Sequence, residues 1–205
     1  MQSIEQTLAA TRMFRNLTRE QLAALARLGE EVEYADGSRL MIEGEPADWF
    51  FVIREGFVAL QTDAPSGAIT IETLHNGDSV GWSWLFEPYL AHFDARSRGV
   101  TRVIRFDGAA LRERCAEEPA LGYELMRGFA SVIVQRLQAT RLQLLDVYGG
   151  ATQAIRFDAA TLRVRCAEDR ELGYELMRSF ASVIVERLQA TRLQLLDVYG
   201  RATVS

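Results

Sequence analysis

A chain of 205 residues, of which 48% are hydrophobic, is long enough to bury one substantial core. Its net charge of −5 provides no basic field for attracting nucleic acid or anionic lipid, so we do not expect it to bind DNA or a membrane by itself. All 23 basic residues are arginine, which excludes chemistry that needs a lysine amine. The two cysteines form no CxxC pattern and no uninterrupted apolar run has membrane-spanning length, which predicts a cytoplasmic protein.

Residues 1–29 are predicted to be helical. Thr18 and Gln21 have the spacing of a capping box, and leucines follow them at helical intervals. From residue 30 to residue 106, short runs rich in Val, Ile, Phe and Thr alternate with glycine-containing turns, roughly every 8 to 12 residues. Turns at this spacing indicate a compact antiparallel roll or barrel.

Helical periodicity returns after residue 107. Asp107 is placed to cap a short helix that includes Leu111 and Cys115, and a longer helix is predicted from Pro119 to Tyr148. Apolar residues on the longer helix recur in steps of three and four, as in a coiled-coil seam: Met126, Ala130, Ile133, Leu137, Thr140, Leu144 and Val147. We expect this seam to form a symmetric homodimer; packing onto the chain's own roll is the alternative.

The strongest signal in the sequence is an internal repeat. Residues 104–152 recur as residues 155–203 at a constant offset of 51 positions, and each unit comprises a strand and two helices. One roll has one place for that unit, so two near-identical segments compete for it. We expect the first copy to occupy this place because its strand follows the roll directly, which makes the connecting loop shorter. The second copy then has to bury its apolar face in a dimer interface, against the first copy, or by segment swapping.

Residues 7–149 resemble the cyclic nucleotide-binding domain family, in the branch that includes the bacterial catabolite activator protein. The resemblance rests on an ordered series of motifs, MFRNLT, EGEPAD, IREGFV and HNGDSVGW. It implies an α+β fold: an antiparallel β-roll of the double-stranded β-helix or jelly-roll type, with an N-terminal helical segment and long C-terminal dimerisation helices. The last strand-helix-helix unit is duplicated, so residues 1–149 form the roll domain with its helix and residues 150–205 the duplicate.

In that family a small anionic ligand, cAMP or cGMP, lies on a cassette that corresponds here to residues 77–98. The resemblance implies contacts from Gly81, Trp82, Ser83, Trp84, Arg96 and Thr140. Ser83 is expected to cap a short helix over residues 84–86 whose free N–H groups receive a phosphate, and Arg96 to add a bidentate contact. Trp82 stands where the family has the acidic residue that binds the ribose, and the family's phosphate arginine falls near Ala91 or His92. The aromatic side chains of the cassette either stack on a base or fill the core.

We predict a non-enzymatic, ligand-sensing regulatory module that signals through its long helix to a partner protein. The alternative is a structural dimerisation or assembly module whose degenerate pocket binds no cyclic nucleotide. A metal-dependent enzyme on a similar barrel needs two or three clustered histidines, whereas the only two, His75 and His92, are 17 positions apart. No catalytic or metal site is therefore predicted. Only GRATVS follows Tyr199, so the family's helix-turn-helix DNA-binding domain is not expected.

Overall fold

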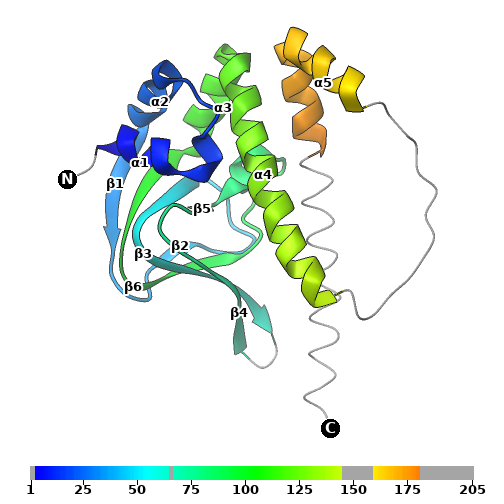
Figure 1. Ribbon diagram of the computed structural model, residues 1–205. Helices are drawn as coiled ribbons and strands as arrows, with labels where there is room; N and C mark the ends of the chain where they lie inside the picture. The colour runs from blue at the N-terminus through cyan, green and yellow to red at the C-terminus, as the bar shows by residue number, and fades with distance from the viewer. Residues whose placement is uncertain (1–2, 65–66, 145–158, 181–205) are drawn as a thin grey trace.

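The computed structural model describes residues 3–64, 67–144 and 159–180 (Figure 1). The chain begins with two short helices, α1 (Ile4–Ala10) and α2 (Arg19–Ala26), joined through the 3-10 helix η1 (Arg12–Phe14). Thr18 caps α2: its side chain accepts a hydrogen bond from the backbone of Gln21, whose side chain accepts one from the backbone of Thr18. The predicted helical segment and its capping box are confirmed.

A roll of antiparallel strands follows. Its members in the described residues are β1 (Gly29–Tyr34), β2 (Arg39–Met41), β3 (Trp49–Ala64), β4 (Gly67–Leu74), β5 (Ser79–Val80) and β6 (Asp94–Asp107). The main order is β1-β6-β3-β4, with β2 paired to β6 and β5 paired to β3. The two long strands β3 and β6 run through the roll side by side (Figure 1). The α+β class with an antiparallel roll is confirmed.

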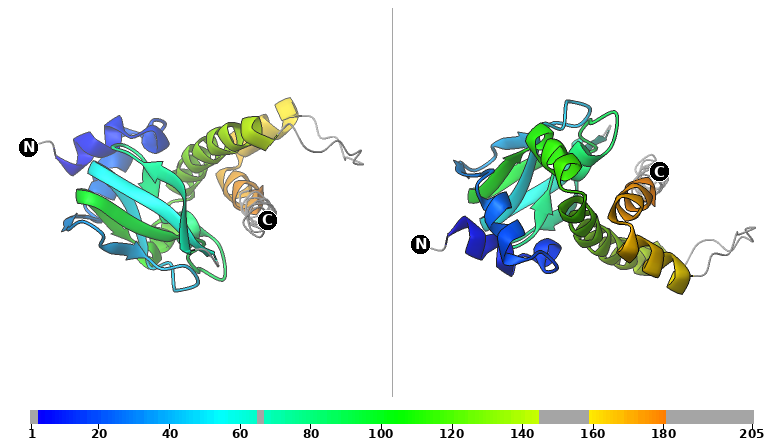
Figure 2. Two further views of the ribbon diagram at one scale, coloured as in Figure 1. Left: turned by 90° about the horizontal axis from the view of Figure 1, so that it is seen from below. Right: turned by 90° about the horizontal axis from the view of Figure 1, so that it is seen from above.

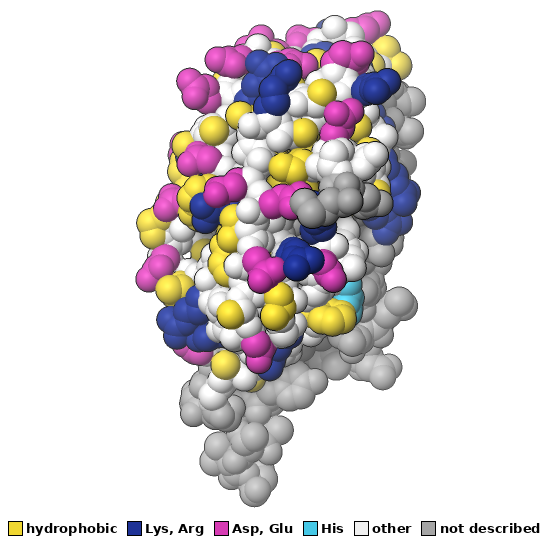
Figure 3. All heavy atoms as spheres, turned by 90° about the vertical axis from the view of Figure 1, so that its left-hand side faces the viewer, with side chains coloured by type: hydrophobic (Ala, Val, Ile, Leu, Met, Phe, Trp, Pro, Cys, Tyr) yellow, Lys and Arg dark blue, Asp and Glu magenta, His cyan; other side chains and the backbone are white. Residues whose placement is uncertain are grey.

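Acidic and basic side chains alternate on the face of the roll that Figure 3 shows. Arg102 of β6 forms ion pairs with Glu33 of β1 at 2.9 Å and with Glu55 of β3 at 3.0 Å. Arg105 pairs with Glu30 at 2.8 Å. These pairs join neighbouring strands, and in each of them the arginine charge lies beside a carboxylate.

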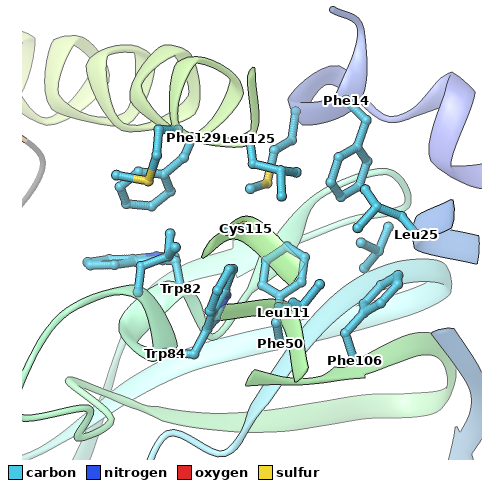
Figure 4. Close-up of a cluster of buried hydrophobic side chains, with 14 of the residues drawn as sticks. Phe14, Leu25, Phe50, Trp82, Trp84, Phe106, Leu111, Cys115, Leu125 and Phe129 are labelled. Atoms are coloured by element: carbon cyan, nitrogen blue, oxygen red, sulfur yellow. The ribbon is translucent and has the colours of Figure 1, made fainter. Parts of the chain in front are cut away.

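Side-chain alternation along the central strands gives the sheet two apolar faces. Phe51 and Ile53 point into the roll core, which comprises Leu40, Phe51, Ile53, Val58, Leu60, Leu74, Val80, Ala95 and Val103. Phe50 and Val52 point to the other side, into a helix-side core that includes Phe14, Trp84, Leu111, Leu121, Met126 and Phe129 (Figure 4). The helices that precede the roll in the chain and those that follow it therefore pack on the same side of the sheet and share one core.

Strand β6 leads directly into α3 (Gly108–Glu117) and α4 (Pro119–Leu144). Asp107 caps α3 as predicted, its carboxylate accepting a hydrogen bond from the backbone N–H of Ala110 at 2.8 Å. The first copy of the repeat thus takes the place beside the roll. Met126 and Ile133, the seam residues expected at a dimer interface, are instead buried in the chain's own helix-side core. The side chains of the seam beyond residue 133 lie outside the described residues.

The second copy of the repeat lies on the side of α4 that faces away from the roll (Figures 1 and 2). Its helix α5 (Ala159–Glu168) corresponds to α3, and residues 170–180 form the helix that corresponds to the start of α4. The strand expected to open this copy falls outside the described residues. Among the helices that are described, none is long and apolar enough to cross a membrane.

Candidate ligand-binding site

A small hollow opens at the end of the roll core, next to the 3-10 helix η2 (Trp82–Leu85). It is lined by Met41, Leu60, Val80, Gly81, Trp82, Ser83, His92 and Phe93. Its cavity volume is about 10 Å³, close to what a single water molecule needs. Pockets for small ligands commonly measure about 300–1,000 Å³. A ligand as large as a nucleotide therefore has to displace side chains of the lining.

Gly81 fixes the entry to η2. Its backbone has φ 86°, in the left-handed region, and a Cβ added there would lie only 2.5 Å from the carbonyl oxygen of Trp49. Glycine is the residue that adopts this conformation without a steric cost. The 3-10 helix begins at the next residue, so Gly81 is its N-cap and no side chain caps it. The expectation that Ser83 caps a helix over residues 84–86 is wrong: Ser83 lies inside η2, buried.

Trp82 connects the hollow to the long helix. Its ring lies 5.8 Å from the ring of His92, on the side of the hollow, and 5.4 Å from the ring of Phe129, which projects from α4 (Figure 4). Only 9% of Trp82 is exposed. One side chain therefore contacts both the hollow and α4.

Trp84 belongs to the helix-side core and does not line the hollow. Its ring packs 6.1 Å from that of Phe50, and its Nε1 is buried without a hydrogen-bond partner. Arg112 of α3 donates a hydrogen bond to the carbonyl oxygen of Trp84 at 2.7 Å, and its guanidinium lies 4.2 Å from the ring centroid of Tyr89. Arg112 thus fastens the loop that follows η2 onto α3.

Arg96 is not among the residues that line the hollow. Arg96 lies in β6 opposite Arg39 of β2. Its neighbour Ala95 belongs to the roll core, and successive side chains of a strand point to opposite faces, so Arg96 projects away from that core. Thr140 lies on α4, at a position whose side chain is outside the described residues.

His92 lines the hollow although it was not predicted to contact a ligand. It lies near the position where the family's phosphate arginine is expected. The structure places its ring beside Trp82, at the hollow. Met41 and Leu60 also line the hollow and were not foreseen, because strand pairing rather than sequence spacing brings them there. Phe93, another lining residue, is one of the cassette aromatic residues that were expected either to stack on a base or to fill the core.

In the described ranges no three His, Cys, Asp or Glu side chains gather in an arrangement that could hold a metal ion. Cys115 and Cys166 are both buried and free. Burial raises the pKa of the Cys115 thiol to about 12, so this thiol is protonated at neutral pH.

Comparison with known proteins agrees with this architecture. The cyclic nucleotide-binding domain family matches residues 31–118. A crystal structure from Geobacter metallireducens GS-15, described as a cyclic nucleotide-binding protein, is 35% identical with a TM-score of 0.59, covering 67% of this chain and 99% of that one. The N-terminal domain of a transcriptional regulator from Streptomyces coelicolor A3(2) is 25% identical with a TM-score of 0.55, covering 71% and 99%. The chain belongs to the cyclic nucleotide-binding domain family.

Within the family, its curated relatives are regulators of the catabolite activator type. A CRP-like cAMP-activated global transcriptional regulator from Mycobacterium tuberculosis is 28% identical over 145 residues. The match covers 70% of this chain and 63% of that protein. The chain therefore spans less than two thirds of the length of the curated relatives it matches.

Proposed function

We propose that this chain is a non-enzymatic ligand-sensing module, in which a small anionic ligand of the cyclic nucleotide class, cAMP or cGMP, enters the hollow and the signal passes through α4 to a partner protein. The observation that carries the proposal is the position of Trp82, between the lining residue His92 and Phe129 of α4. The cAMP-activated relative from Mycobacterium tuberculosis supports the choice of ligand class.

The proposed contacts are the residues of the sequence prediction that line the hollow. Gly81 forms the backbone turn that opens η2, Ser83 offers a hydroxyl, and Trp82 offers a ring face for a base. His92 adds a ring nitrogen beside them. Trp84, Arg96 and Thr140 have no part in the proposal.

The proposed signal is a displacement of Trp82. Because the hollow is smaller than a nucleotide pocket, an entering ligand has to move this ring, which packs against Phe129. A ligand shifts a conformational equilibrium only through contacts that differ between two states. The contact between Trp82 and Phe129 is such a contact, since it exists while the hollow is closed and changes when the ring moves.

A second candidate function is assembly without a ligand. It is favoured by the same side chain, since Trp82 is 9% exposed and already fills much of the space at the mouth of the roll. In that case the module only presents its helices to partners. The described residues do not test the homodimer expected through the long helix.

A ligand titration separates the two candidates. Thermal stability and tryptophan fluorescence are followed while cAMP or cGMP is added, with linear AMP as the control ligand. Binding to the folded chain stabilises it by RT ln(1 + [L]/Kd), about 2.7 kcal/mol at a hundredfold excess over Kd. A saturable response to a cyclic nucleotide supports the sensor; silence with both refutes it and leaves the assembly module.

Two matched variants locate the binding. Ser83→Ala removes one hydrogen-bonding hydroxyl from the hollow and is expected to weaken binding about tenfold, the equivalent of about 1.4 kcal/mol. Trp84→Phe alters a neighbouring core residue that does not line the hollow, so it lowers the melting temperature and leaves the affinity unchanged. Equal affinities for both variants and the wild type would place the ligand elsewhere.

A further inference from the structure

The two copies of the repeat meet through the same residues in each copy. A Cβ added at Gly122 would lie 3.0 Å from the ring of Tyr174, and a Cβ added at Gly173 would lie 2.8 Å from the ring of Tyr123. Gly122 and Gly173 are equivalent positions of the repeat, as are Tyr123 and Tyr174. Each tyrosine therefore lies on the glycine of the other copy. Such reciprocity is the mark of an isologous interface, the kind that joins two identical protomers.

Further contacts surround this reciprocal pair. The guanidinium of Arg170 lies 4.8 Å from the ring centroid of Tyr123 and 3.6 Å from a carboxylate oxygen of Glu124. Tyr174 and Met177 of the second copy pack against the helix-side core. The interface thus combines apolar burial, a cation–π contact and an ion pair on the surface of α4 that faces away from the roll.

The second copy leaves its roll-binding face unused. Leu121 and Phe129 of the first copy are 0% and 2% exposed, because they pack between α4 and the roll. Their equivalents Leu172 and Phe180 are 40% and 51% exposed. The same residue types are therefore buried in the first copy and exposed in the second, and within residues 159–180 the second copy contacts the first through its pairing face.

Two substitutions between the copies keep the second one off the roll. The first copy has Gly128 where the second has Ser179, and a Cβ at position 128 would lie 1.8 Å from the carbonyl oxygen of Met13. It has Gly108 where the second has Ala159, and a Cβ there would lie 2.8 Å from a tryptophan side chain. Gly108 and Gly128, which lie close to the roll and to η1, thus have no glycine equivalent in the second copy. The glycine of the pairing contact is present in both copies, as Gly122 and Gly173.

We propose that the second copy of the repeat is a built-in partner for the first. Residues 159–180 occupy the surface of α4 around Gly122 and Tyr123 that is complementary to a second helix pair of the same sequence. Each chain thereby closes within itself an interface that otherwise joins two chains. It is a monomer with one roll, and its pairing surface becomes available to another chain only when the second copy is released.

The test uses the full-length chain and one variant of the pairing glycine. Gly173→Leu places a side chain where even a Cβ would lie 2.8 Å from the Tyr123 ring. Val164→Ser changes an exposed residue of the same copy and serves as the control. Molar mass is measured by light scattering over a range of concentrations, and hydrogen exchange reports the protection of residues 159–180.

The wild type and Val164→Ser are expected to be monomers with residues 159–180 protected. Gly173→Leu is expected to lose that protection and to form dimers as its concentration rises, through the freed surface of α4. The double variant Gly122→Leu, Gly173→Leu has no intact pairing surface and is expected to stay monomeric. A dimeric wild type overturns the proposal, as does a Gly173→Leu chain that keeps its protection or loses it without forming dimers.

Discussion

Two phenylalanines at equivalent positions of the repeat predict very different consequences of the same mutation. Phe129 of the first copy is buried with its ring 5.4 Å from Trp82 and 5.6 Å from Phe86, whereas half of Phe180 in the second copy is exposed. Both residues stand in nearly identical local sequences, so their helix propensities and unfolded states are alike. A difference between Phe129→Ala and Phe180→Ala therefore measures packing alone.

The expected magnitudes follow from the burial. Replacing a fully buried phenylalanine by alanine costs about 3–5 kcal/mol, because transfer energy is lost and a cavity remains. For a chain of this size each kcal/mol lowers the melting temperature by about 2–4 °C, so Phe129→Ala is expected to lower it by roughly 6–20 °C. Because Phe180 is half exposed, Phe180→Ala loses only about half of a transfer free energy of roughly 1.5–3 kcal/mol and leaves no closed cavity. It is therefore expected to lower the free energy of unfolding by about 1 kcal/mol.

The assay is urea unfolding of both variants and the wild type, followed by tryptophan fluorescence and by circular dichroism. Phe129→Ala is expected to shift the midpoint strongly and Phe180→Ala to leave it nearly in place. Equal shifts would refute the reasoning, since they would mean that the second copy also buries its phenylalanine against a roll.

Three further predictions concern single residues. Gly81→Ala is expected to destabilise the chain by more than about 1–3 kcal/mol in urea unfolding, because its left-handed backbone and the carbonyl oxygen of Trp49 leave no room for a Cβ; no loss would show that η2 starts elsewhere. Asp107→Ala removes the cap of α3 and is expected to cost about 1 kcal/mol by the same assay, while Asp107→Asn restores most of it. Burial raises the pKa of the Cys115 thiol to about 12, whereas an unfolded thiol ionises near about pH 8.5. The thiol contribution to stability is therefore complete below about pH 8.5 and is lost as pH rises toward about 12, so Cys115→Ala is expected to flatten the alkaline fall in the free energy of unfolding.

Local chemistry made part of this fold predictable from the sequence. The capping box of Thr18 and Gln21 and the cap at Asp107 each depend on residues three positions apart, and both occur as expected. The roll was predicted by the spacing of its turns and by the resemblance to a known family. Helix caps can be predicted from the sequence because they depend only on residues a few positions apart.

The site was less predictable because strand register and long-range packing decide it. Arg96 was expected to face the ligand, but the pairing of β6 makes its neighbour Ala95 the inward residue. Trp82 was assigned to the cassette from its position, whereas its contact with Phe129 joins residues far apart in the chain. The second copy has Ser179 where the first has Gly128, and a Cβ at that position would clash with Met13 of η1. This difference disfavours the second copy beside the roll, but the sequence does not reveal that α4 approaches η1 so closely.

The replacement of Gly128 by Ser179 also bears on how the chain reaches its native state. Ribosomes add about 5–20 residues per second, so the 51 residues that separate the copies take roughly 3–10 s to make. During synthesis the roll can accept α4 before its competitor exists. On dilution from denaturant both copies are present at once and carry the same leucine and phenylalanine for the roll, so we expect an intermediate in which the second copy occupies the roll and has to dissociate. Refolding is then expected to show a slow phase that Ser179→Gly prolongs, since the wrong copy would dock more firmly.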